Sequence, residues 1–106
     1  MMSASCRASV QIRNKLGLHA RPAAHFVRLA ARFSADIFLV RDSVEVNGKS
    51  IMGVMMLAAE EGARIEIRAE GEDAERAVEE LAALVDRGFD EDDDGRPVRA
   101  GDNADE

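Results

Sequence analysis

RIEIRAEGEDAERAVEELAALV, residues 64–85, contains two periodicities in succession. Residues 64–70 alternate apolar and polar residues, which predicts a half-buried β-strand with Ile65, Ile67 and Ala69 on its inner face. After Gly71 the apolar spacing becomes that of an amphipathic helix, and Gly88 is expected to end it. The helix is predicted to bury the residues at its apolar positions: Ala74, Ala77, Val78, Leu81, Leu84 and Val85.

Three more strands are predicted before this segment. Residues 8–13 alternate apolar and polar residues, and residues 37–41 and 44–46 are rich in residues that favour strands. Only Asp42 and Ser43 separate the last two runs, which predicts a tight hairpin.

Two more helices are predicted. Helical spacing of apolar residues begins beside Pro22, which fits the first turn of a helix, and continues to Phe33. Ser50 is a good N-cap for a short apolar helix, and Gly62 is expected to end it.

The predicted order is therefore strand, helix, strand, strand, helix, strand, helix, in one domain at residues 1–89. Each strand has one apolar face and each helix one apolar stripe, so we expect an α+β fold with three helices on one side of a four-stranded antiparallel sheet. Residues 90–106 are acidic and contain few apolar residues, which predicts a disordered tail.

Charge is distributed unevenly along the 106 residues. Residues 1–49 contain eight Arg or Lys and three Asp or Glu, a net charge of +5, whereas residues 50–86 have −7 and residues 87–106 have −5. The chain has too few basic and aromatic residues for a nucleic-acid-binding face. Cys6 has no second cysteine to pair with, and no apolar run is long enough to cross a membrane, so we expect a cytoplasmic protein.

His19 is the strongest candidate for chemistry. It precedes the helix at Pro22, and the start of a helix exposes unpaired amides and favours an anion. Arg21 adds a cation whose shape suits phosphate oxygens, and the alanines at 20, 23 and 24 leave room for a tetrahedral group. A neutral imidazole can attack phosphorus without a separate base, so the segment suits a phosphohistidine.

Several alternatives remain open. One histidine and one arginine at a helix start are common, so both could be plain surface residues. A hydrolase is disfavoured because residues 1–35 contain no Asp or Glu to activate water. His25 is not expected to share a metal site with His19, and Ser43 stands where a nucleotide-binding loop ending in residues 47–50 would need glycine.

The short helix after Ser50 has apolar residues on nearly every side. A helix this short cannot turn all of its apolar side chains toward one sheet, so we expect some of these side chains to be exposed. Exposed methionines suit a surface that adapts to several partners. This leaves a regulator that acts through phosphorylation of Ser50, with His19 secondary, as a second hypothesis.

Three segments, NKLGLHARPAA (14–24), VNGKSIMGVMMLAAEEG (46–62) and IEIRAEGEDAERAVEEL (65–81), resemble in order and spacing the HPr phosphocarrier family of the bacterial phosphotransferase system. The resemblance covers roughly residues 8–92 and implies an open-faced β-sandwich. It implies that enzyme I, which draws on phosphoenolpyruvate, phosphorylates His19 on Nδ1. The phosphoryl group would then pass to an enzyme IIA component, with Arg21 contacting it.

The resemblance also implies a regulatory site and a docking surface. Ser50 in GKSIMGVM is similar to the serine that HPr kinase/phosphorylase modifies. Residues around it would contact the partners: Ala20, Ile51, Met52, Met55 and Met56. The ending LVDRGFDED (84–92) is similar to the nitrogen-related branch, which favours regulation over sugar transport. By this resemblance the protein is a monomeric stoichiometric carrier, not an enzyme, and it needs no cofactor or metal.

Overall fold

The strands form one antiparallel sheet in which the first strand of the chain pairs with the fourth, the fourth with the second, and the second with the third. A computed structural model describes residues 5–91 of the chain. Its strands are β1 (Ser5–Gln11), β2 (Asp36–Arg41), β3 (Val44–Asn47) and β4 (Arg64–Glu70). Its helices are α1 (Ala20–Ala30), α2 (Ile51–Met56), α3 (Ala74–Asp86) and the 3-10 turn η1 (Gly88–Asp90). The predicted order of elements is confirmed.

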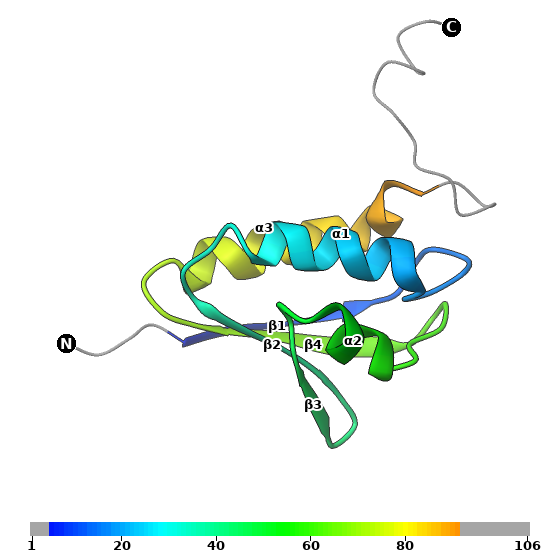
Figure 1. The fold of residues 1–106 in the computed structure, drawn as a ribbon, viewed down its shortest axis with the longest axis horizontal. Helices are drawn as coiled ribbons and strands as arrows, with labels where there is room; N and C mark the ends of the chain where they lie inside the picture. Colours follow the sequence, from blue (N-terminus) through cyan, green and yellow to red (C-terminus); the bar gives the residue numbers. More distant parts are fainter. Residues whose placement is uncertain (1–4, 92–106) are drawn as a thin grey trace, which may run out of the picture.

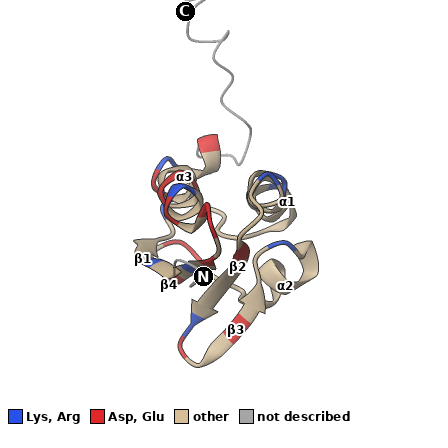
Figure 2. Cartoon of the chain, turned by 90° about the vertical axis from the view of Figure 1, so that its left-hand side faces the viewer, with Lys and Arg blue, Asp and Glu red and all other residues tan. Residues whose placement is uncertain are grey.

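The helices lie on one side of the sheet (Figures 1 and 2). α3 packs over β1 and β4, and α1 packs beside α3 and contacts α2. α2 also contacts β3 at the edge of the sheet. This is the predicted α+β open-faced β-sandwich: one layer of helices, one sheet, and one uncovered sheet face.

The core forms where the two periodic patterns meet. Ile65, Ile67 and Ala69 of β4 are buried, as the alternation predicted, and Phe26 of α1 is fully buried between the layers. The six predicted inward residues of α3 are also buried. Burial of this apolar surface contributes roughly 25 cal/mol for each Å² removed from water, which makes it the main force holding the helices on the sheet.

β1 runs from Ser5 to Gln11, earlier than the predicted residues 8–13. Its length is set by its partner, because β4 extends to Glu70 and pairs there with Ser5. Ile12 lies just beyond the strand, where its amide still donates to the Ala63 carbonyl at 2.8 Å. The local alternation alone carried no information about how far the partner strand reaches.

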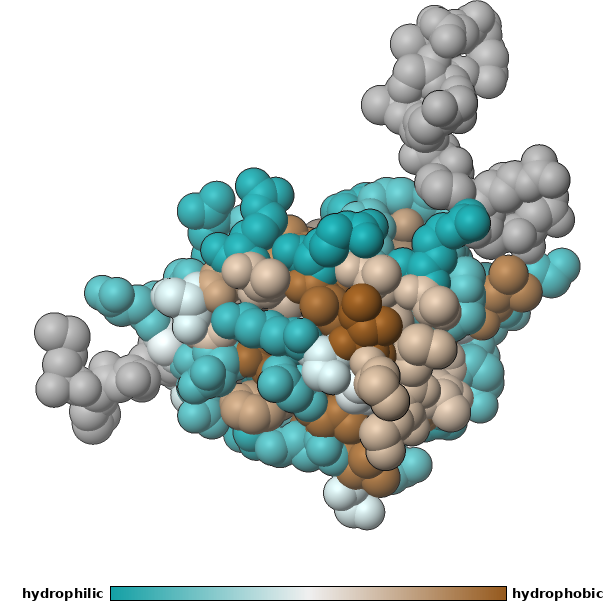
Figure 3. Space-filling view, in the orientation of Figure 1, coloured by the Kyte–Doolittle hydropathy of each residue, from teal (hydrophilic) through white to brown (hydrophobic). Residues whose placement is uncertain are grey.

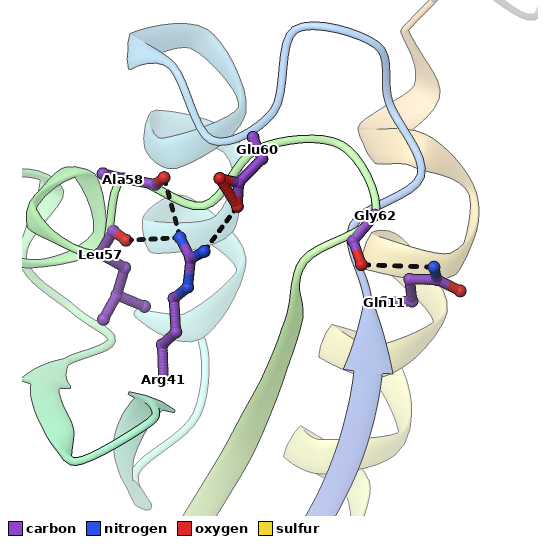
Figure 4. A network of polar contacts seen from close by, with 6 residues as sticks. All are labelled: Gln11, Arg41, Leu57, Ala58, Glu60 and Gly62. Atoms are coloured by element: carbon purple, nitrogen blue, oxygen red, sulfur yellow. Dashed lines mark hydrogen bonds and ion pairs between the residues drawn. The ribbon is translucent and has the colours of Figure 1, made fainter.

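α2 ends at Met56, so the prediction that Gly62 ends this helix was wrong. Ala58 has a φ of 49°, which takes the backbone out of the helix. Arg41, from the end of β2, donates from Nη1 to the Leu57 carbonyl at 3.1 Å and to the Ala58 carbonyl at 2.9 Å (Figure 4). The arginine thus pairs with carbonyl groups that the end of a helix leaves without partners.

The described chain continues past Phe89, the last residue of the predicted domain, into residues assigned to the predicted tail. Phe89 is 2% exposed and packs in the core, and Asp90 belongs to η1. The rest of the predicted tail, residues 92–106, lies outside the described residues. None of the helices formed by residues 5–91 has the length and hydrophobicity that crossing a bilayer requires.

Candidate functional site

His19 is the N-cap residue of α1. Its backbone is extended, with φ −78° and ψ −174°, and its carbonyl accepts the first helical hydrogen bond from the Ala23 amide at 3.0 Å. Pro22, third in the helix, has no N–H, so the amides of Ala20 and Arg21 are the helical donors left without an acceptor inside the helix. Both amides lie at the end of the helix that His19 occupies, where the helix dipole favours an anion.

The loop before α1 has a fixed path because it packs against the segment after α2. Gly17 has a φ of 70°, and a Cβ on it would lie 2.5 Å from the Ala59 carbonyl oxygen. Leu18 is buried, and its amide donates to the same Ala59 carbonyl at 2.9 Å. Only glycine meets both the conformational and the steric requirement at position 17. The position of His19 therefore depends on this contact.

Glu91 contacts the ring of His19, which the sequence analysis missed. His19 Nε2 lies 3.3 Å from Glu91 Oε1 and 3.2 Å from Oε2. Only the contact to Oε1 has hydrogen-bond geometry, since Oε2 has no hydrogen-bond partner within residues 5–91. The His19 side chain is 33% exposed and that of Glu91 is 2% exposed. The expectation that no acid lies near His19 was wrong, because the acid comes from 72 residues further along the chain.

Asn14 holds the Glu91 carboxylate in place. Its side chain is buried, and its Nδ2 donates to Glu91 Oε1 at 2.9 Å and to the Gly17 carbonyl at 2.8 Å. The side-chain amide of Asn14 therefore links the loop before His19 to Glu91. No sequence signal marked Asn14 as part of the site.

A pocket of about 240 Å³ opens beside Glu91, along α1. α1 carries arginines and no acidic residue, which makes this side of the site basic (Figure 2). The pocket is lined by Arg21, Pro22, His25, Arg28, Phe89, Asp90 and Glu91. The predicted site residues His19 and Arg21 thus lie together at one helix end. Among residues 5–91, no cluster of His, Cys, Asp or Glu side chains could hold a metal ion.

Ser50 is the N-cap of α2, as predicted. Its Oγ accepts a hydrogen bond from the Gly53 amide at 3.1 Å, and the residue is half-buried. The turn before it is closed by Asn47, whose Oδ1 accepts from the Lys49 amide at 2.8 Å. This serine therefore has a structural role in the fold, whatever else it does.

An exposed apolar surface covers α2. Met52 is 77% exposed and Met56 is 74% exposed, whereas Val54 and Leu57 are buried beneath them. Figure 3 shows apolar side chains gathered over α2 and the neighbouring end of α1. Leu16, 54% exposed in the loop before His19, is a further exposed apolar residue that the sequence analysis did not single out. We call the exposed apolar residues of α2 the α2 surface: Ile51, Met52, Met55 and Met56.

Known proteins match most of this chain. A family model described as the HPr component phosphorylation site of the phosphotransferase system matches residues 6–87. The HPr-like protein Crh of Bacillus subtilis is 53% identical over 76 residues, which are 72% of this chain and 89% of Crh. The phosphocarrier protein HPr of Treponema pallidum is 46% identical over 83 residues, covering 78% of this chain and 94% of that protein.

Solved structures agree with the fold. The crystal structure of an HPr from Thermoanaerobacter tengcongensis matches with a TM-score of 0.79 and 44% identity, covering 82% of this chain and 98% of that one. The Crh protein of Bacillus subtilis was crystallised as a dimer with a swapped domain. The expectation of a monomer for the present chain remains a prediction.

Proposed function

Because the chain belongs to the HPr family of the phosphotransferase system, we propose that it accepts a phosphoryl group on His19 from enzyme I and passes it to an enzyme IIA component. The observation that carries this proposal is the position of His19, the N-cap of a helix whose first two amides have no helical acceptor. The protein would act as a stoichiometric carrier, without a cofactor, in the cytoplasm.

The proposed relay has two steps at this site. In the first, the lone pair of His19 Nδ1 attacks phosphorus and the bond from phosphorus to the donor breaks. The amides of Ala20 and Arg21, with the Arg21 guanidinium, would then face the phosphoryl oxygens. In the second, an acceptor attacks phosphorus and the electron pair of the N–P bond returns to Nδ1. The second step regenerates the free imidazole of His19, so the carrier can repeat the cycle with another phosphorylated donor.

Intact mass after incubation with enzyme I and phosphoenolpyruvate tests this proposal. We expect one added phosphate that mild acid removes, since acid breaks P–N bonds and spares P–O bonds. His19→Ala should accept none while keeping the circular dichroism spectrum of the parent. Acid-labile phosphate on the His19→Ala variant would refute the assignment.

We also propose that HPr kinase/phosphorylase modifies Ser50 and so regulates docking on the α2 surface. Support comes from the GKSIMGVM segment and from the exposure of Met52 and Met56 in the helix that Ser50 caps. A dianion at Ser50 would stand beside this surface and repel an acidic partner. Incubation with the kinase and ATP should add an acid-stable phosphate that is absent in Ser50→Ala. An unmodified Ser50 would leave it with its N-cap role.

The docking surface proposed for enzyme I, enzyme IIA and the kinase consists of Ala20 and four residues of α2. Ala20 is exposed at the start of α1, next to His19, and α1 contacts α2. A partner seated on α2 would therefore reach His19. The four residues are Ile51, Met52, Met55 and Met56. The ending LVDRGFDED supports a regulatory role over sugar uptake.

A further inference from the structure

We propose that Glu91 is a positioning residue for His19, accepting a hydrogen bond from Nε2–H and thereby keeping the Nδ1 lone pair free to attack phosphorus. This inference rests on the proposed carrier function. It starts from the contact between His19 Nε2 and Glu91 Oε1 at 3.3 Å.

The contact selects one tautomer of the ring. An ionised carboxylate can only accept hydrogen bonds, so a ring nitrogen held against it must carry the proton. In a neutral imidazole the other nitrogen then bears the lone pair. With Nε2 facing Glu91, that other nitrogen is Nδ1 of His19.

The surroundings leave Nδ1 available. His19 is the N-cap of α1, where a side chain commonly accepts a hydrogen bond from the helix amides. Here the His19 side chain makes no such bond. A capping bond would have occupied the nucleophilic lone pair. The ring instead uses Nε2, which turns Nδ1 away from the carboxylate.

Asn14 and burial make the carboxylate a fixed acceptor. The Glu91 side chain is 2% exposed, and Asn14 Nδ2 donates to its Oε1 at 2.9 Å. Glu91 Oε2 is buried with no hydrogen-bond partner within the described range, so the carboxylate has few other donors to satisfy it there. Buried acceptors without donors are costly, which favours keeping the proton of the imidazole on Nε2.

The same proton can stay on Nε2 through the whole cycle. When Nδ1 bonds to phosphorus, the ring gains positive charge and Nε2–H remains, so no proton has to leave. When the acceptor attacks phosphorus, the N–P electron pair returns to Nδ1 and a neutral imidazole is the leaving group. Glu91 would stabilise the charged ring between these steps.

Three variants separate the effect of losing the hydrogen-bond acceptor from the effect of losing a negative charge. Glu91→Ala removes the acceptor, and we expect phosphoryl transfer from enzyme I to slow by roughly 10- to 100-fold, the loss typical when the hydrogen bond that orients a metal-binding histidine is removed. Glu91→Gln keeps a carbonyl that can accept from both Nε2–H and Asn14, so it should recover most of the rate. Glu79→Gln removes one acidic charge from the exposed side of α3 and should transfer at the parental rate.

Nitrogen-15 NMR of the His19 ring gives a readout that needs no phosphorylation. We expect the parent and Glu91→Gln to show the Nε2–H tautomer in the neutral ring, and Glu91→Ala to show a mixture. An unchanged tautomer and an unchanged transfer rate in Glu91→Ala would overturn the inference. If enzyme I labels none of the proteins, the carrier proposal fails, and the NMR comparison still decides the tautomer.

Discussion

Asn14 donates a 2.9 Å hydrogen bond to Glu91, joining the loop before α1 to the last described residue of the chain. Both groups are buried, and Glu91 in turn contacts His19. The site is thus closed by two chain segments that lie 77 residues apart. The carboxylate that contacts the ring of His19, at the start of α1, therefore comes from the last described residue of the chain.

Replacing Asn14 should weaken both the fold and the site. Asn14→Ala removes one donor from the buried Glu91 carboxylate and one from the Gly17 carbonyl, so we expect a loss of about 1–3 kcal/mol in the free energy of unfolding. Urea denaturation measures this loss. Asn14→Asp should lower the free energy of unfolding further, because it places a second carboxylate against the carboxylate of Glu91. Equal stability of the two variants would show that this bond to Glu91 contributes little.

Gly17→Ala should be destabilising for two separable reasons. The φ of 70° is costly for alanine by about 1–2 kcal/mol, and the new Cβ would meet the Ala59 carbonyl at 2.5 Å. Gly62→Ala is the matched control, since Gly62 has a φ of 89° with no atom within 4 Å of its Cβ position. Thermal unfolding should show a larger loss for Gly17→Ala. Similar losses would mean that the loop moves aside without cost.

Acid should destabilise the protein partly through Asp73. Its Oδ2 accepts from the Ser34 amide at 2.9 Å and its Oδ1 from the Ala35 amide at 2.8 Å. The bond from the Ser34 amide is the largest cause that lowers the pKa of Asp73 below its ordinary value of 3.8. The contribution of Asp73 to the free energy of unfolding is therefore complete above the pKa that Asp73 has in the unfolded chain. It is lost as pH falls through the lower pKa that Asp73 has in the folded protein.

Asp73→Asn tests this assignment. The variant should unfold at a lower temperature near neutral pH and should lose less stability on acidification than the parent. Glu72→Gln, an exposed neighbour, controls for the removal of one negative charge. A parental acid transition in Asp73→Asn would assign the effect to other carboxylates.

Much of the fold could be predicted because β4 and α3 carry their own apolar faces. The failures came from long-range partners. The end of α2 was misplaced because the carbonyls of Leu57 and Ala58, directly after the helix, accept from Arg41, which belongs to another element. Glu91 was missed because an acidic run predicts disorder by composition. Phe89, a large apolar residue directly after Gly88, was the signal that the chain still packs there.

Changing the α2 surface should affect partner binding and leave stability nearly unchanged. Met52 is so exposed that Met52→Glu should alter the free energy of unfolding by less than about 0.5 kcal/mol. If enzyme I docks there, its affinity should fall at least about tenfold, the typical effect of losing a central apolar contact. Ala83→Glu, on the exposed side of α3, is the control. Isothermal titration with enzyme I compares them, and equal affinities would place docking elsewhere.

Arg41→Met should destabilise the end of α2. The variant keeps an unbranched apolar stem and removes the donors to the Leu57 and Ala58 carbonyls, so we expect a loss of about 1–3 kcal/mol in the free energy of unfolding. Arg41 Nη2 also lies 2.6 Å from Glu60 Oε1, but Glu60 is exposed and such ion pairs contribute little. Glu60→Gln should therefore change stability much less than Arg41→Met. Hydrogen exchange of the α2 amides would locate the effect, with faster exchange expected only in Arg41→Met. Faster exchange of these amides in Glu60→Gln as well would instead assign the stabilisation to the ion pair.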